Sequence, residues 1–131
     1  MANEIKMVFD NQMHGIITGH HGSSQVGPSE GALAAYDMFL GGLGACLNHT
    51  FQSVLDKKKL KVHGINYDIK GVKREEVPTT LKTVDVNVTI SGVDEEDKTK
   101  VEKSFEMATR YCSVYQTISH VADMSYTVNY K

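Results

Sequence analysis

The strongest constraint on the fold is a strict alternation of apolar and polar residues in three segments of the chain. These segments span residues 65–70, 84–90 and 124–130. A two-residue period is typical of β-strands that turn one face to a core and the other to water. Helical patterns are set apart from these strands rather than alternating with each of them, which favours an α+β fold over a doubly wound parallel sheet. With 131 residues and no internal repeat or linker, we expect a single domain over residues 1–131.

The N-terminal region reads as a hairpin followed by a loop. Two short strand-like runs, residues 4–9 and 12–18, flank Asp10 and Asn11, a pair typical of a tight turn. Residues 19–31 are rich in glycine and contain one of the two prolines, so we expect a loop there.

A long helix is predicted from about residue 32 to residue 58. Its apolar stripe follows a spacing of three to four residues and consists of Phe39, Leu43, Leu47, Thr50 and Val54. Lysines 57–59 stand at its C-terminal end, where positive charge complements the helix dipole.

Three glycines, Gly41, Gly42 and Gly44, weaken this helix just before Cys46. Each costs about 1 kcal/mol relative to alanine in a helix interior. One interpretation is that a helix, a second subunit or a substrate approaches the backbone closely there. The alternative is a kink or a late helix start near Leu43.

A second helix is expected after the strand at residues 84–90. Asp94 is a candidate N-cap, and Val101, Phe105 and Ala108 form the apolar face. We expect this helix to break around Cys112, with the following "SVYQTIS" supplying further helical turns.

Charge and hydropathy argue against several classes of partner. The formal net charge is -2 and no broad basic face is evident, so nucleic acid is not an expected partner. The sequence shows neither a signal-peptide pattern nor an apolar run long enough to cross a membrane. We therefore expect a cytoplasmic protein without membrane association.

Two cysteines 66 positions apart carry the clearest chemical signal. In a reducing cytosol they indicate free thiols, a metal site or redox chemistry rather than a structural disulfide, and two inert core thiols remain an equal alternative. Cys46 shares a helix face with Gly42, Leu43, His49 and Thr50. Cys112 is expected near a helix N-terminus with Arg110 two residues away, and both features would lower its thiol pKa.

The contexts of both cysteines resemble the OsmC/Ohr family of thiol-dependent peroxidases and related proteins. The similar motifs are "GGLGACLNHT" on the central helix, "YCSV" near the second thiol and "VPTTLKTVDVNVTISG" between them, with Gly27 and Pro28 near the start of the match. The resemblance implies an intertwined α+β homodimer in which a long central helix packs on antiparallel sheets and the active sites lie at the subunit interface.

The same resemblance implies a chemistry and its participants. Cys46 would attack an organic hydroperoxide, Cys112 would resolve the sulfenic acid as a disulfide, and an external dithiol would reduce that disulfide. No cofactor is implied. Asp37 stands where the peroxidases carry a glutamate before the central helix, and Ser113 stands where the family commonly has proline. The peroxidases also carry an N-terminal arginine, whereas no arginine precedes Arg74 here.

Histidines supply the auxiliary candidates. His49 is one turn from Cys46 and is a candidate base, although helix-face histidines are more often hydrogen-bonded filler. His20 and His21 are candidates for lining the site or replacing the missing arginine, or are simply exposed loop residues. A zinc site built from the two cysteines and two histidines lacks the paired short spacing of zinc motifs, so we expect no metal.

Two functional hypotheses follow. The first is a redox enzyme that reduces organic hydroperoxides through Cys46 and Cys112. The second, prompted by the missing arginine, is a non-peroxidase relative that binds a small apolar ligand at the dimer interface.

Overall fold

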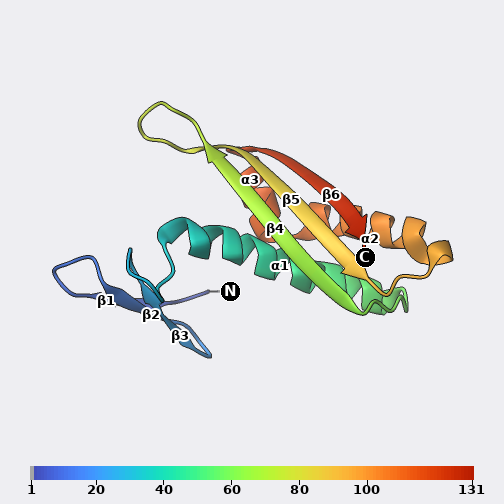
Figure 1. Ribbon diagram of the computed structural model, residues 1–131, viewed down its shortest axis with the longest axis horizontal. Helices are drawn as coiled ribbons and strands as arrows, with labels where there is room; N and C mark the ends of the chain where they lie inside the picture. The colour runs from blue at the N-terminus through green and yellow to red at the C-terminus, as the bar shows by residue number, and fades with distance from the viewer. Residues whose placement is uncertain (1) are drawn as a thin grey trace. The chain divides into compact units, whose positions relative to one another are not determined.

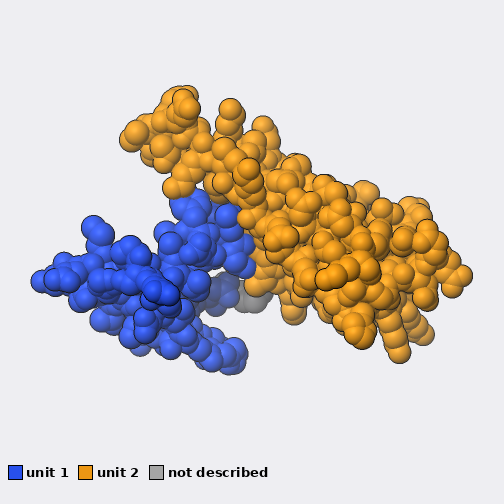
Figure 2. All heavy atoms as spheres, viewed as in Figure 1, with its two compact units in different colours: residues 1–41 blue, residues 42–131 orange. Residues whose placement is uncertain are grey.

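A computed structural model describes residues 2–131 and shows two three-stranded sheets and three α-helices (Figure 1). The chain forms two compact units, Met1–Gly41 and Gly42–Lys131, which Figure 2 colours separately. The boundary falls inside the long helix, so each unit is described by itself below. The α+β class expected from the sequence is confirmed, whereas the single domain stays a prediction.

The first unit contains a small antiparallel sheet in the order β1-β2-β3. Its strands are β1 (Lys6–Phe9), β2 (Gly15–Thr18) and β3 (Ser23–Val26). The expected hairpin is confirmed, with Phe9 opposite Gly15. The loop expected over residues 19–31 is wrong in part, because β3 lies within it and pairs with β2. Four residues are too few to show a clear alternation among so many turn-forming neighbours.

The long helix, α1, spans Ala35–Lys57. Its first turn is capped by Asp37, whose Oδ2 accepts the N–H of Ala34 at 2.8 Å. It ends where Lys59 takes a positive φ of 58° and Leu60 donates its N–H to the carbonyl of Leu55 at 2.9 Å. The helix runs without interruption through its glycines, which rules out a late start near Leu43.

The buried face of α1 differs from the expected stripe. Leu43 and Leu47 are fully buried as expected, but the stripe continues through Phe51 and Leu55 rather than Thr50 and Val54. Phe39 is 47% exposed. Both series have helical spacing, and the position of the second sheet decides which of them is covered.

The second unit is built on a sheet in the order β4-β5-β6. Its strands are β4 (Gly64–Lys73), β5 (Leu81–Ser91) and β6 (Asp123–Tyr130), which confirms all three alternating segments. The central β5 buries Val84, Val86, Val88 and Ile90 completely. β4 pairs with it antiparallel, whereas β6 pairs parallel, so this sheet is mixed rather than wholly antiparallel.

The parallel pairing of β5 and β6 requires a long crossover, which carries the remaining helices. They are a 3-10 turn η1 (Glu95–Asp97), α2 (Lys98–Tyr111) and α3 (Ser113–Ser119). Asp94 is the N-cap residue of η1, so its expected position is confirmed, but its side chain makes no capping hydrogen bond. The break between α2 and α3 falls at Cys112, as expected.

An aromatic cluster joins the helices of the second unit to one face of its sheet. The ring of Phe105 on α2 lies 5.0 Å from that of Phe51 on α1 and 5.2 Å from that of Tyr126 on β6. Phe51 and Phe105 are fully buried. This packing fixes α1 against α2, and the functional side chains lie along that contact.

Among residues 2–131, no helix is both long enough and apolar enough to cross a bilayer.

Candidate active site

The two thiols lie side by side in the second unit. The Sγ atoms of Cys46 on α1 and Cys112 are 3.2 Å apart, and the Cys112 thiol donates to the Cys46 sulfur. Both cysteines are free; Cys46 is half-buried and Cys112 is fully buried. A disulfide has a sulfur separation of about 2.05 Å, so closing this pair needs a movement of only about 1.2 Å.

The helix break at Cys112 creates the surroundings of both sulfurs. Cys112 has extended backbone angles, donates its N–H to the carbonyl of Ala108 at 2.8 Å and caps α3. Its Sγ accepts the N–H of Tyr115 at 3.4 Å. The Oγ of Ser113, the first residue of α3, lies 4.0 Å from the sulfur of Cys46. The start of α3 therefore presents polar groups to both thiols.

These surroundings shift the pKa values of the two thiols in opposite directions. Partial burial raises the pKa of Cys46, but hydrogen bonds from the backbone of Val114, the Cys112 thiol and the Ser113 hydroxyl outweigh it, and the pKa falls below the ordinary value of 9.0. Burial, together with the neighbouring Cys46, raises the pKa of Cys112 to about 11. Of the two sulfurs, Cys46 is the one that ionises more readily.

The expected lowering of the Cys112 pKa is therefore wrong. The side chain of Arg110 forms an exposed ion pair with Glu106 at 3.8 Å. Burial outweighs the single amide hydrogen bond that Cys112 receives from Tyr115, so its thiol stays protonated. The N-terminus of α3 acts on both sulfurs, but only at Cys46 do its hydrogen bonds help to lower the pKa below the ordinary value.

An open groove of about 440 Å³ begins one turn along α1 from the half-buried thiol. Its lining includes Thr50, Val54 and Lys57 from α1 with Met107 and Tyr111 from α2. Thr50 follows Cys46 by one turn and donates its hydroxyl to the Cys46 carbonyl at 3.1 Å. The groove thus has apolar side chains in its wall, and its lysines belong to the C-terminal end of α1.

Comparison with known proteins identifies this arrangement. The family model for OsmC-like protein matches residues 27–127. The chain belongs to the OsmC-like protein family. A comparison with curated proteins found no match.

Solved structures share the OsmC-like fold over almost the whole chain. An OsmC-like protein from Mycoplasma pneumoniae is 14% identical with a TM-score of 0.87, covering 99% of this chain and 97% of that one. A hypothetical protein from Aquifex aeolicus is 21% identical with a TM-score of 0.83, covering 100% and 98%. An organic hydroperoxide resistance protein from Legionella pneumophila is 14% identical with a TM-score of 0.74, covering 98% and 97%.

The other residues expected at the site of this OsmC-like chain have separate surroundings. Asp37, His20 and His21 belong to the first unit. Asp37 caps α1, and the two histidine rings contact each other edge to face at 5.1 Å in an exposed turn between β2 and β3. His49 is exposed on α1. Roles for these four residues and for Arg110 in chemistry at the thiols stay predictions.

Sequence reasoning missed the polar groups that act on Cys46. Ser113 was noted only as a departure from the family pattern, and Val114 only as part of the "YCSV" motif. The usable signal was the helix break itself, because the first residues after a break carry unpaired backbone N–H groups.

Gly44 explains part of the glycine run in this OsmC-like chain. A Cβ at Gly44 would lie 3.1 Å from Cδ1 of Ile69 on β4, so its absence lets the sheet approach the helix two residues before Cys46. A Cβ at Gly41 or Gly42 would meet nothing within 4 Å.

Within residues 2–131, no three His, Cys, Asp or Glu side chains are grouped so that they could hold a metal ion. That the protein needs no metal or cofactor stays a prediction.

Proposed function

We propose that this OsmC-like protein is a thiol-dependent redox enzyme that reduces organic hydroperoxides, with Cys46 as the peroxidatic cysteine and Cys112 as the resolving cysteine. The observation that carries the proposal is the 3.2 Å sulfur pair, in which Cys46 has a lowered pKa and Cys112 a raised one. The hydroperoxide-resistance proteins of Legionella pneumophila and Bacillus subtilis that share the fold support the same chemistry.

In the first step the Cys46 thiolate attacks the distal oxygen of the hydroperoxide. The S–O bond forms as the O–O bond breaks, Cys46 is oxidised to a sulfenic acid, and the alkoxide leaves as an alcohol after taking a proton from solvent. The backbone N–H of Val114 and the Ser113 hydroxyl stabilise the thiolate that starts this step.

In the second step Cys112 attacks the sulfur of the sulfenic acid. The disulfide forms, and the hydroxyl leaves as water with the proton from Cys112. The charge on Cys46 contributes to the raised pKa of Cys112, and that contribution disappears once Cys46 is a neutral sulfenic acid. Oxidation of the first thiol therefore prepares the second. An external dithiol then reduces the disulfide by exchange and is itself oxidised.

The groove lined by Thr50, Val54, Met107 and Tyr111 favours substrates with an apolar body. The same groove also supports the alternative function, in which a small apolar ligand binds without peroxide chemistry. Turnover by the purified protein separates the two, because a binding protein consumes no hydroperoxide.

The decisive experiment measures consumption of cumene hydroperoxide in the presence of dithiothreitol. Cys46→Ser should abolish turnover. Cys112→Ser should still perform the first step and accumulate a sulfenic acid on Cys46 that dimedone traps. Ser119→Ala is a suitable control, because its hydroxyl bonds the carbonyl of Gln116 on α3. Unchanged turnover in Cys46→Ser would overturn the proposal.

We further propose that the enzyme is a cytoplasmic homodimer. The first unit supports dimerisation because, within residues 2–41, Val26 is the only hydrophobic side chain in the buried class. Apart from Val8 and Ile16, seven large hydrophobic residues of this unit are exposed: Ile5, Met7, Phe9, Met13, Leu33, Tyr36 and Phe39. A monomer rarely leaves so much apolar surface in water. Sedimentation equilibrium should give twice the chain mass, and a monomer at micromolar concentration would contradict the proposal.

A further inference from the structure

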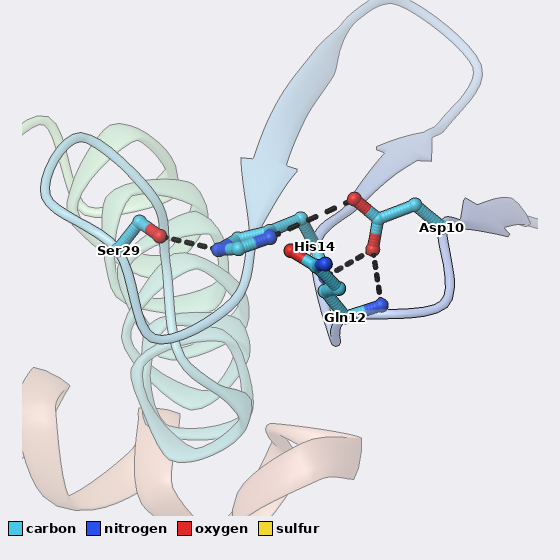
Figure 3. A network of polar contacts seen from close by, with 4 residues as sticks. All are labelled: Asp10, Gln12, His14 and Ser29. Carbon is cyan, nitrogen blue, oxygen red and sulfur yellow. Dashed lines mark hydrogen bonds and ion pairs between the residues drawn. The ribbon is translucent and has the colours of Figure 1, made fainter.

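Three side chains of the first unit form a relay of polar contacts, one hydrogen bond and one ion pair (Figure 3). The Oγ of Ser29 lies 2.5 Å from Nε2 of His14, and Nδ1 of His14 lies 3.6 Å from Oδ2 of Asp10. Figure 3 shows the imidazole of His14 lying between the hydroxyl and the carboxylate. This is the order of groups found in Ser-His-Asp hydrolases, where each ring nitrogen has its own partner.

The turn after β1 holds the carboxylate in place. Oδ1 of Asp10 accepts the N–H of Gln12 at 2.8 Å and the N–H of His14 at 3.0 Å. These backbone hydrogen bonds also lower the pKa of Asp10, so the group is a carboxylate at neutral pH. With Oδ1 anchored to the backbone, Oδ2 remains to orient the imidazole.

The backbone around the relay is tightly fitted. Gly27 has a φ of 146°, and a Cβ there would lie 2.8 Å from the carbonyl oxygen of Met13. Only glycine allows the chain that leads to Ser29 to approach the turn carrying His14 so closely. Met13 itself has a φ of 71°, which is strained for a residue with a side chain. Strained backbone of this kind concentrates at functional sites.

The relay lines an open pocket of about 350 Å³, a volume within the range of small-molecule sites. Its apolar wall includes Val8, Ile16 and Val26. Besides the relay residues, Gln25 is the polar side chain of the lining, and its amide is a neutral hydrogen-bond donor. The pocket thus combines a nucleophile with its base, an apolar wall and a polar donor.

We propose that Asp10, His14 and Ser29 form a second catalytic site that hydrolyses short-chain carboxylic esters. Ser29 Oγ attacks the ester carbonyl while Nε2 of His14 takes the hydroxyl proton. The C–O bond to the leaving alcohol then breaks, and His14 returns the proton to that oxygen. Water, deprotonated by His14, attacks the acyl-serine and releases the carboxylic acid, so that serine is regenerated. Gln25 donates to the carbonyl oxygen as it becomes negative.

The first test labels the wild-type protein with a fluorophosphonate, which reacts with activated serine hydroxyls and transfers its phosphonyl group with loss of fluoride. Peptide mass spectrometry should find the adduct on Ser29. Labelling should be absent in Ser29→Ala and at least about 100-fold slower in His14→Gln, the usual contribution of a general base. Ser23→Ala, a serine of the same sheet outside the relay, should label normally. A Ser29 that labels no faster than Ser23 would overturn the proposal.

The second test measures hydrolysis of p-nitrophenyl butyrate. Thiols and surface imidazoles also attack this ester, so the informative quantity is the difference between the wild type and Ser29→Ala with both cysteines present. We expect at least a tenfold loss in Ser29→Ala and in His14→Gln, and only the loss of one background imidazole, less than about twofold, in His21→Gln. Equal rates in the wild type and Ser29→Ala would show that the relay is not catalytic.

Measuring hydroperoxide turnover in the same variants tests the proposed thiol chemistry independently of the proposed ester hydrolysis. Ser29→Ala should consume cumene hydroperoxide at the wild-type rate, because both sulfurs and the groups that act on them are unchanged. Either activity can then fail without the other.

Discussion

The Cys112 thiol donates to the sulfur of Cys46 over 3.2 Å, although 66 positions separate the two residues in the chain. This single contact makes the pair asymmetric. It stabilises negative charge on Cys46, and the same charge makes the proton of Cys112 harder to remove. Under the proposed function, the half-buried sulfur is the nucleophile and the buried one is the resolving thiol.

The first prediction concerns the pH dependence of alkylation. The thiolate is the reactive form, so a lowered pKa makes a cysteine reactive at lower pH and a raised pKa delays its reaction. Cys46 should react with iodoacetamide below pH 9.0, whereas Cys112 should react appreciably only as the pH approaches about 11. Peptide mass spectrometry after timed alkylation separates the two sites. Earlier alkylation of Cys112 would contradict the assignment.

The second prediction concerns Ser113. Replacing it with alanine removes a hydroxyl 4.0 Å from Cys46 Sγ, which should raise the pKa of Cys46. Because hydrogen bonds to charged groups contribute about 1.5–3 kcal/mol and this contact is long, hydroperoxide turnover should fall by less than about tenfold. Ser119→Ala is the matched control, since its hydroxyl bonds the Gln116 carbonyl within the same short helix. An equal loss in both variants would indicate a general effect on α3.

The third prediction uses Gly42, whose missing Cβ faces open space within the chain. On a free surface, Gly42→Ala should stabilise α1 by up to about 1 kcal/mol. If a partner chain packs against this backbone, as the proposed homodimer implies, the same methyl group should weaken the dimer instead. Urea unfolding at two protein concentrations distinguishes these results. Greater stability with unchanged dimerisation would place the interface elsewhere.

The fourth prediction concerns the aromatic cluster around Phe105. Phe105→Ala should lower the free energy of unfolding by about 3–5 kcal/mol, because it leaves a cavity and removes the ring contacts with Phe51 and Tyr126. Urea titration followed by circular dichroism measures the loss. Val72→Ala, on an exposed side chain of β4, should cost far less.

Regular patterns made the larger elements predictable. β5 is buried on alternate residues from Val84 to Ile90, and that period is visible in the sequence. β3 was missed because four residues between turns carry little periodic information. The face of α1 was misassigned because Phe51 and Leu55 have the same spacing as Thr50 and Val54, and only the tertiary fold selects between them.

The two cysteines of the candidate site were predictable from the sequence, but the directions of their pKa shifts were not. The pairing of Cys46 with Cys112 was expected from the family-like motifs around each cysteine, since nothing in their spacing brings them together. The sequence located a helix break at Cys112, but the direction of the exposed amides depends on backbone angles. For that reason the lowered pKa was expected for Cys112 and is found at Cys46. The relay of Asp10, His14 and Ser29 depends on the packing of Gly27 and escaped notice altogether.

Because Cys112 lies in the crossover between β5 and β6, its ability to form a disulfide indicates whether β6 has paired with β5. Its segment is held at both ends only after the final strand has docked beside Val86, parallel to it. In a molecule in which β6 is not paired with β5, the segment that carries Cys112 is fixed only at its N-terminal end. The Cys112 sulfur would then lie too far from Cys46 to form a disulfide. The yield of intramolecular crosslink under mild oxidant therefore gauges the fraction of molecules whose C-terminal strand is in place.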